Sequence, residues 1–384
     1  MLSYLRNEKV RGVLYQILVI AGFVTLAWFI AINTAHNIQV RGIKSGFDFL
    51  HSTAGFDITE SPIPFSPQST HWDVFKVGLL NTLIIAFAGI LLSSLLGLII
   101  GVARLSSNWL INRLAAGYIE TFRNIPVLLQ ILFWYNVVLA TLPAARKSIN
   151  LFDAVFINNR GLFVPRPLFG EGAWMIAAAL GVALIGSWGL FRWARKRHDA
   201  TGQEFPAFWA SLGLLIALPT LAYFLSGQPI HFEYPALKGF NFHGGKVYTP
   251  EFLALLFALS IYTATFIAEA IRSGIEAVPK GQKEAATALG LTPTQSLRFV
   301  VLPQAIRIAI PSIINQYLNL TKNSSLAAAI GYPELVTIFA GTSLNQTGQA
   351  LEIIGITMLT YLIISLVVSF ILNWFNAKMK IKER

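Results

Sequence analysis

Residues 283–303 read KEAATALGLTPTQSLRFVVLP, a polar and well-punctuated stretch between two strongly apolar segments. Its first half is rich in helix formers and ends at Gly290, the usual residue for the left-handed turn that closes a helix. The pattern predicts a helix that stops at Gly290. Small apolar side chains line part of this helix, at Ala285, Ala286, Ala288 and Leu289.

The second half begins with a helix-start signal. Thr292 and Gln295 have the spacing of a capping box, and Pro293 occupies the first helical position, where its missing N–H costs nothing. A second helix is therefore predicted over about 293–302, leading to Pro303. The whole stretch is expected to form a helix, a glycine turn and a capped helix.

Two uses of this hairpin fit its residues equally well. An alanine surface has a low profile, so the groove of another protein can close tightly around it. A hairpin with one apolar face can also lie flat on a bilayer. Helix propensity alone leaves both alternatives open.

The composition of the whole chain indicates an all-α integral membrane protein. Its 384 residues are 55% hydrophobic and only 12% charged, with a mean hydropathy of +0.61. Continuous apolar runs near the length that crosses about 30 Å of hydrocarbon predict helices and not a β-barrel. About eight spans are expected, at about 12–34, 77–103, 117–142, 174–191, 206–225, 250–271, 309–331 and 352–376.

The basic residues predict the orientation. Loops that would face inward with a cytoplasmic amino terminus carry about twice as many Lys and Arg residues as the outward loops. Both termini and the hairpin are therefore predicted to be cytoplasmic. The same bias accounts for the net charge of +11, so no nucleic-acid partner is expected.

Three regions are predicted along the chain: an extra amino-terminal helix and outside loop (1–76), a transmembrane domain (77–376), and a basic cytoplasmic tail (377–384). Within the domain, about 143–249 is predicted to be an insertion that carries two extra helices. The second span has small residues every four positions, at Gly89, Ser93, Gly97 and Gly101. This spacing predicts a close helix contact within the fold.

The hairpin resembles the EAA loop of ABC importer permeases. The matching positions, in the family's order and spacing, are Glu284, Ala285, Ala286, Gly290, Leu302 and Pro303. Val300 stands where the family usually has Ile. The resemblance implies that these six residues form a coupling helix, which docks on a separate ATPase subunit and moves with it.

Further stretches resemble the polar amino-acid uptake subgroup of these permeases: ETFRNIPVLLQILFWY (120–135), YTATFIAEAIRSGIEAVPKGQKEAA (262–286), LPQAIRIAIPSIINQ (302–316) and TKNSSLAAAIGYPEL (321–335). The extended chain is similar to the Q-type permeases of general L-amino-acid transporters. The resemblance implies a type I importer domain of MetI-like fold in a bacterial inner membrane. It also implies the substrates and partners of such a system: L-amino acids, a periplasmic amino-acid-binding protein, two copies of an ABC ATPase that carry ATP and Mg, and a second, related permease subunit that completes a heterodimer.

The seventh span carries a polar stripe on one helical face, formed by Ser312, Asn315, Asn319, Lys322 and Asn323. A lysine near mid-membrane is costly and usually faces a cavity or a partner. One hypothesis is that the stripe lines the substrate pathway, with Lys322 attracting an amino-acid carboxylate. The alternative is that Lys322 pairs with a buried acid or carbonyls, while the amides hold helices together.

No catalytic group or metal site is predicted in this chain. The closest approach to a phosphate-binding loop, GFNFHGGKV (239–247), lacks the required spacing and the Ser or Thr, and the six histidines lack ligand spacing. ATP hydrolysis is therefore expected on a partner, and no cofactor on this chain. Two rival interpretations remain open: an ion-coupled secondary amino-acid transporter, which would need a mid-membrane acid, and a membrane scaffold or sensor.

Overall fold

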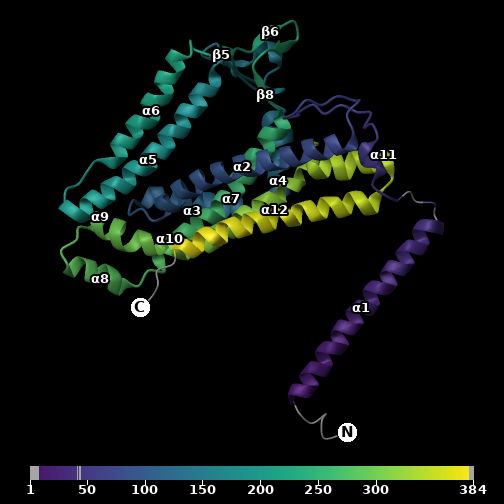
Figure 1. Cartoon of the computed structure of the whole chain (residues 1–384), viewed down its shortest axis with the longest axis horizontal. Coiled ribbons are helices and arrows are strands. Elements are labelled where there is room, and N and C mark those ends of the chain that lie inside the picture. The colour runs from purple at the N-terminus through teal and green to yellow at the C-terminus, as the bar shows by residue number, and fades with distance from the viewer. Residues whose placement is uncertain (1–7, 41, 43–44, 380–384) are drawn as a thin grey trace. The chain divides into compact units, whose positions relative to one another are not determined.

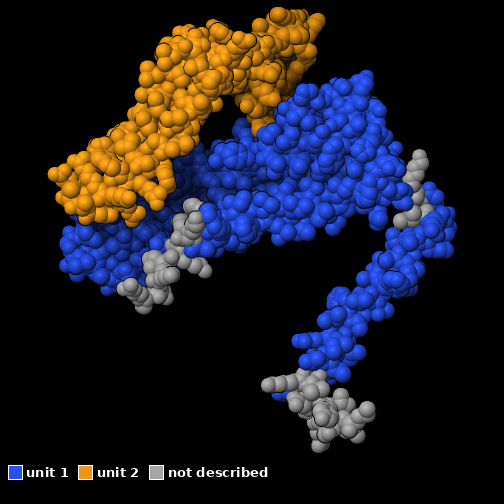
Figure 2. Space-filling model, viewed as in Figure 1, with its two compact units in different colours: residues 1–132, 255–384 blue, residues 133–254 orange. Residues whose placement is uncertain are grey.

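The computed structural model describes residues 8–40, 42 and 45–379. The predicted basic tail at 377–384 therefore lies mostly outside the described residues, as do residues 1–7 of the amino-terminal region. The described chain divides into two compact units, coloured in Figure 2. The first comprises 1–132 and 255–384, and the second comprises 133–254.

The first unit is built from long apolar helices (Figure 1). Its main helices are α1 (Glu8–Val40), α2 (His71–Arg104), α3 (Trp109–Asn124), α7 (Pro250–Glu276), α10 (Leu302–Asn323) and α12 (Ala350–Met379). In the described chain, seven helices are long and apolar enough to cross a membrane, and one bent pair makes an eighth candidate. The prediction of about eight spans is confirmed.

The small residues of α2 make the predicted close contact. A Cβ added at Gly97 would lie 2.6 Å from Cγ2 of Ile267 on α7, and one at Gly101 would lie 3.0 Å from the Ala268 carbonyl oxygen. A Cβ at Gly89 would lie 3.1 Å from Leu320 of α10. Glycine thus permits a close approach of α7 to α2 at Gly97, where an added Cβ would clash, and a tight contact with α10 at Gly89.

The predicted third span, 117–142, is wrong as a single helix. The structure breaks it into α3 and α4 (Val127–Phe133), bent by 100° as a pair, with a π-helical turn η3 (Trp134–Leu139) after α4. Pro126 disfavours helical geometry in Ile125, which is extended at φ −93° and ψ 126°. The side chain of Gln130 donates to the carbonyls of Phe122 and Ile125 at 2.9 and 3.0 Å, satisfying acceptors that the break exposes.

The segment before α2 is structured and contributes to the core. It contains the short 3-10 helix η2 (Asp48–His51), and its buried side chains are Phe49, Ala54 and Ile58. They pack in one cluster with the start of α2, with α12 and with the π-helix η7 (Leu335–Ser343). The first unit is completed by η6 (Ser324–Ala329), α11 (Leu344–Thr347), α8 (Lys280–Ala288), α9 (Pro293–Ser296) and η5 (Leu297–Val301).

The second unit contains the helical pair α5 (Ala173–Thr201) and α6 (Ala207–Leu225). Small buried residues such as Ala183 and Ser211 lie between them, and a Cβ at Gly186 would lie 2.8 Å from Leu214. Most of the remaining side chains on both helices are exposed, as expected of helices that face lipid.

Short antiparallel strands flank this helical pair, and the sequence did not predict them. One sheet has the order β1-β2-β3-β8, and two further pairs join β4 to β5 and β6 to β7. The bounds are β1 (Ile149–Leu151), β2 (Val155–Asn158), β3 (Gly161–Val164), β4 (Arg166–Phe169), β5 (Ile230–Glu233), β6 (Ala236–Lys238), β7 (Asn241–His243) and β8 (Lys246–Tyr248). The 3-10 helix η4 (Ala145–Lys147) precedes them.

Candidate functional site: the coupling hairpin and the polar face of α10

The predicted turn at Gly290 is confirmed in atomic detail. Gly290 has φ +77°, its N–H donates to the carbonyl of Thr287 at 2.9 Å, and the N–H of Leu291 donates to the carbonyl of Ala286 at 3.1 Å. These two bonds form the Schellman arrangement, which requires a left-handed residue at the Gly290 position. The first helix of the hairpin, α8, ends where the sequence predicts.

The capping box of the second helix is also confirmed. The N–H of Gln295 donates to Oγ1 of Thr292 at 3.3 Å, and the N–H of Thr292 donates to Oε1 of Gln295 at 2.9 Å. Pro293 lies in the first turn of α9. The two ends of the turn are therefore fixed by local bonds of the hairpin itself.

The predicted end of the second helix near residue 302 is wrong. The helix continues from α9 through the π-helical turn η5 into α10, so helical structure runs from Pro293 to Asn323. Proline has no N–H, and it removes one bond from the regular helical pattern. The wider turn of η5 directly before Pro303 accommodates that loss without ending the helix.

The predicted coupling residues divide into a buried and an accessible set. Ala286 is 2% exposed and helps to close the hairpin, whereas Glu284, Ala285 and Gly290 are exposed. Leu289 beside them is 81% exposed, which is unusual for a leucine in a water-facing turn. The hairpin thus presents an apolar tip with an adjacent carboxylate, and no part of the described chain covers it.

Leu302 and Pro303 lie at the base of the hairpin. Leu302 is half-buried, Pro303 is exposed, and Val301 just before them packs with Val278 and Ala305 in a small apolar cluster. This cluster joins the end of α7 to the start of α10. The six residues that match the EAA loop therefore all belong to the hairpin and its base, although they do not form one surface.

The polar stripe of α10 lies on an open face of the single chain. Ser312, Asn315, Asn319 and Lys322 are exposed, and Asn323 is half-buried. None of the ion pairs among the described residues involves Lys322, which argues against its pairing with a buried acid of this chain. A face of this polarity in a membrane helix needs water or another protein beside it.

A hollow of about 440 Å³ adjoins Lys322 on this open face. It lies between the end of α10, η7 and α12, and Ser325, Thr357, Tyr361 and Ser365 supply its polar lining. Lys322 therefore has hydroxyl groups around it and no carboxylate in the lining of the hollow. Three of the hydroxyls already donate within the chain, from Ser325 to the Lys322 carbonyl, from Thr357 to the Ile353 carbonyl and from Tyr361 to Glu334. The ammonium of Lys322 is therefore the main group that this hollow offers to a small anionic ligand.

The structure also shows an important residue that sequence reasoning missed. Glu334 is fully buried and accepts four hydrogen bonds, from the N–H groups of Val336 and Thr337, the Thr337 hydroxyl and the Tyr361 hydroxyl, at 2.8 to 2.9 Å. It lies in the segment between the spans of α10 and α12. Burial raises the pKa of its carboxyl above the usual value, and the four donors oppose that rise.

Two polar side chains of α2 fix the same segment. Asn81 donates to the carbonyl of Pro333 at 2.9 Å, and the N–H of Leu335 donates to Oγ1 of Thr82 at 3.2 Å. An acidic residue placed two and three positions before the donors at Val336 and Thr337 is a helix-start pattern that the sequence does contain. The sequence therefore contains the helix-start pattern at Glu334, but it does not show that residues of α2 and α12 contact this segment.

Comparison with known proteins identifies the family of this chain. Residues 200–381 match the model of the binding-protein-dependent transport system inner membrane component. The chain is 50% identical over all of its length to the general L-amino acid transport system permease protein AapQ of Rhizobium johnstonii, covering 95% of that protein. It is also 50% identical to the putative amino-acid ABC transporter permease protein YhdX of Escherichia coli, over 98% of this chain and 96% of that one.

A third relative is the glutamate/glutamine/aspartate/asparagine transport system permease protein BztB of Rhodobacter capsulatus. It is 40% identical over 98% of this chain and 96% of its own length. The similarity therefore extends over both units, including the strands and the α5–α6 pair. On this evidence the chain belongs to the family of binding-protein-dependent transport system inner membrane components, as a multi-pass permease subunit of an ABC importer and not an enzyme.

Proposed function

We propose that this permease moves L-amino acids across the bacterial inner membrane, using ATP hydrolysed on a separate ABC ATPase that docks on the hairpin around Gly290. The observation that carries the proposal is the preformed hairpin with its uncovered tip at Leu289 and Ala285. The names of the relatives, which include general and acidic amino-acid systems, support the class of substrate.

The connection between the hairpin and α10 gives the proposed coupling a physical route. The helical run from Pro293 to Asn323 links the turn at Gly290 to the polar stripe without a loop. Packed helices respond to a displaced end by shifting as units and not by bending continuously. When a docked ATPase moves the hairpin, α10 would therefore move with it and displace the polar stripe.

The same polar face supports a second permease subunit as partner. Exposed Asn315, Asn319 and Lys322 would be costly against lipid, and a neighbouring subunit around a shared pathway removes that cost. We propose a related subunit, giving a heterodimer, with two copies of the ATPase. A periplasmic amino-acid-binding protein would deliver the substrate.

ATP and Mg belong to the ATPase in this proposal. Among the described residues no group of His, Asp and Glu side chains has the geometry of a metal site. The chain also lacks the spacing of a phosphate-binding loop. In this proposal the energy for uphill transport enters through the hairpin.

Purification of the permease from its native membrane in a mild detergent tests the proposal. An ABC-type ATPase is expected to co-purify, and Leu289→Asp is expected to lose it, because a charge replaces the apolar tip. Leu225→Asp, which changes an equally exposed leucine at the end of α6, serves as the control. Amino-acid uptake driven by an ion gradient in vesicles that contain this chain alone would establish the secondary transporter instead.

Replacement of Lys322 by methionine is expected to lower the apparent affinity for amino acids about tenfold to hundredfold. The reason is that a charged hydrogen bond to a carboxylate contributes roughly 1.5–3 kcal/mol. Uptake of labelled glutamate and glutamine by proteoliposomes of the whole complex measures the change. Lys322→Arg should retain most of the affinity, and Lys238→Met in β6 should match the parent. Unchanged uptake and substrate range for Lys322→Met would remove Lys322 from the pathway.

A further inference from the structure

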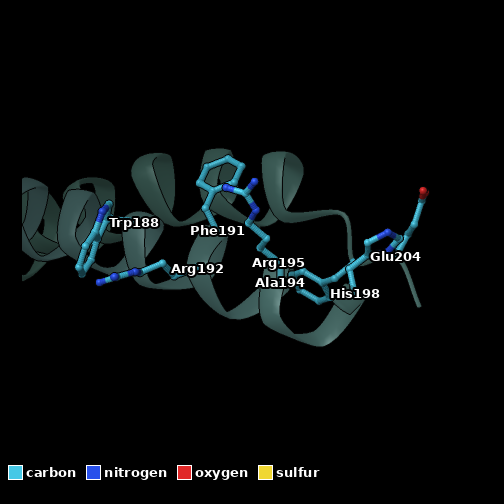
Figure 3. Close-up of a pocket in the computed structure, with 8 residues that line it drawn as sticks. Trp188, Phe191, Arg192, Ala194, Arg195, His198 and Glu204 are labelled. Carbon is cyan, nitrogen blue, oxygen red and sulfur yellow. The ribbon is translucent and has the colours of Figure 1, made fainter. Parts of the chain in front are cut away.

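A basic and aromatic hollow at the turn between α5 and α6 has no role in the transport cycle proposed above. We call it the α5–α6 hollow; it has a volume of about 570 Å³. Its lining includes Trp188, Phe191, Arg192, Arg195, His198 and Phe205 (Figure 3). All of these residues belong to the second unit, so the hollow is built within one compact part of the chain.

One arginine of the hollow is held at an aromatic ring. The Arg192 guanidinium lies 4.7 Å from the centroid of the Trp188 ring. Figure 3 shows Arg192 extended toward Trp188, back along the helix. Side chains of an α-helix point toward its amino terminus, and stacking on a ring fixes a guanidinium plane there. The charge of Arg192 is therefore directed toward the apolar part of α5.

The two arginines of the hollow have no carboxylate partner in the described chain. None of its ion pairs involves Arg192 or Arg195. Glu204 also lines the hollow, but its carboxylate lies at the opposite end from both guanidinium groups in Figure 3. The hollow thus presents two free guanidinium groups, each with several N–H donors, to a ligand from outside the chain.

The position of the hollow along α5 is that of a membrane surface. Arg192 lies about 28 Å along the helix from Ala173, close to the roughly 30 Å thickness of the hydrocarbon core. Exposed tryptophans gather at this end, with Trp188 62% and Trp209 of α6 70% exposed. Tryptophan at such positions typically marks the level of the lipid headgroups.

From these observations we infer that the α5–α6 hollow binds the phosphodiester headgroup of an anionic phospholipid. A guanidinium matches the geometry of phosphate oxygens and forms paired hydrogen bonds with them. The exposed rings of Trp188 and Phe191 would lie against the glycerol and upper acyl chain, whereas a free phosphate would leave them in water. The basic-residue pattern predicts that this end faces the cytoplasm, where anionic headgroups attract basic segments.

A bound headgroup would also stabilise the helical pair. α5 and α6 bury mainly small residues against each other, and their ends meet through the ring contact of Trp193 with Phe205 and the hydrogen bond from Arg197 to Gln203. A lipid phosphate at Arg192 and Arg195 would share the hollow with Phe205, which follows the turn, and would add a contact between the end of α5 and the start of α6. Lipid occupancy is thus expected to accompany a fixed α5–α6 turn.

Native mass spectrometry of the intact transporter complex tests this inference. The complex is equilibrated in detergent with equal amounts of dioleoyl phosphatidylglycerol and dioleoyl phosphatidylethanolamine. The parent is expected to retain phosphatidylglycerol preferentially, and Arg192→Gln with Arg195→Gln is expected to lower that retention about thirtyfold, since each basic contact contributes about fivefold. Replacement of both by lysine keeps the charge, loses the fork geometry and should lower retention less.

The matched control is Lys196→Gln with Arg113→Gln, which removes the same charge from exposed positions on the predicted cytoplasmic side, outside the lining of the hollow. It should stay within about twofold of the parent, given that screened surface charges contribute weakly. Equal losses in both double variants would overturn the inference in favour of a general charge effect. Displacement of the lipid by 10 mM inorganic phosphate, about the concentration that saturates a weak anion site, would overturn it in favour of a soluble anion site. Unchanged retention in the Arg192 and Arg195 glutamine variant would overturn it altogether.

Discussion

Replacement of Gly290 by valine is expected to reduce ATP-driven amino-acid uptake about tenfold to hundredfold, with the chain still inserted in the membrane. Gly290 has φ +77°, a conformation that a β-branched residue adopts only at a cost of about 1–3 kcal/mol. The space around its Cα is open, so the effect comes from the backbone and not from a clash. A strained turn would misdirect α8 relative to α9 and weaken docking of the ATPase.

Two variants isolate this cause. Gly290→Asn should retain a large part of the activity, because asparagine tolerates the left-handed conformation better than other residues. Gly281→Val in the same helix α8 should be nearly silent, as Gly281 has no left-handed backbone and no atom near its Cβ direction. Uptake and ATPase activity are measured together in proteoliposomes. Normal coupled uptake by Gly290→Val would show that docking does not depend on this turn.

Replacement of Glu334 by leucine is expected to cause the largest loss of stability, about 3 kcal/mol or more. The carboxylate accepts four hydrogen bonds in a fully buried position, and two of the donors are backbone N–H groups. A leucine would leave these donors without acceptors, and each buried unsatisfied group costs about 1–3 kcal/mol. The start of η7 and its contact with Tyr361 of α12 would loosen together.

The loss is measured as the temperature at which half of the detergent-solubilised complex leaves the monodisperse peak. A fall of roughly 5–10 °C is expected for Glu334→Leu. Glu334→Gln keeps one acceptor oxygen and should fall less. Glu276→Gln, which removes an acid from a half-exposed pair with Arg272, should shift the temperature little. Equal stability of Glu334→Leu and the parent would mean that the four bonds contribute no net stability.

The sequence predicted the hairpin well because its signals are local. Gly290, Thr292, Pro293 and Gln295 act on neighbours within a few residues, so their spacing determines the turn and the cap without tertiary help. The apolar runs predicted the number of spans for a similar reason, since a bilayer imposes the same length requirement on every helix.

Predictions from local signals were wrong at two prolines, where another contact or a change of helix type compensated for the missing hydrogen bond. Pro126 breaks the third span, and the break is stable because Gln130 returns to satisfy the freed carbonyls. Pro303 does not end its helix, because the π-helical turn η5 absorbs the missing bond. In both places the proline was visible in the sequence, but the compensation that decides its effect was not.

The sequence by itself determined that this is a mainly helical membrane protein with a helical hairpin around Gly290, and it located the polar stripe of α10. Only the tertiary structure decided that Ala286 is buried while Leu289 is uncovered, that Lys322 has no acidic partner in the described chain, and that Glu334 joins α2, η7 and α12. The physical reason is the separation along the chain between the residues that interact. Caps, turns and hydropathy depend on residues a few positions apart, whereas burial and hydrogen-bond partners depend on segments tens to hundreds of residues distant that meet only when the helices pack.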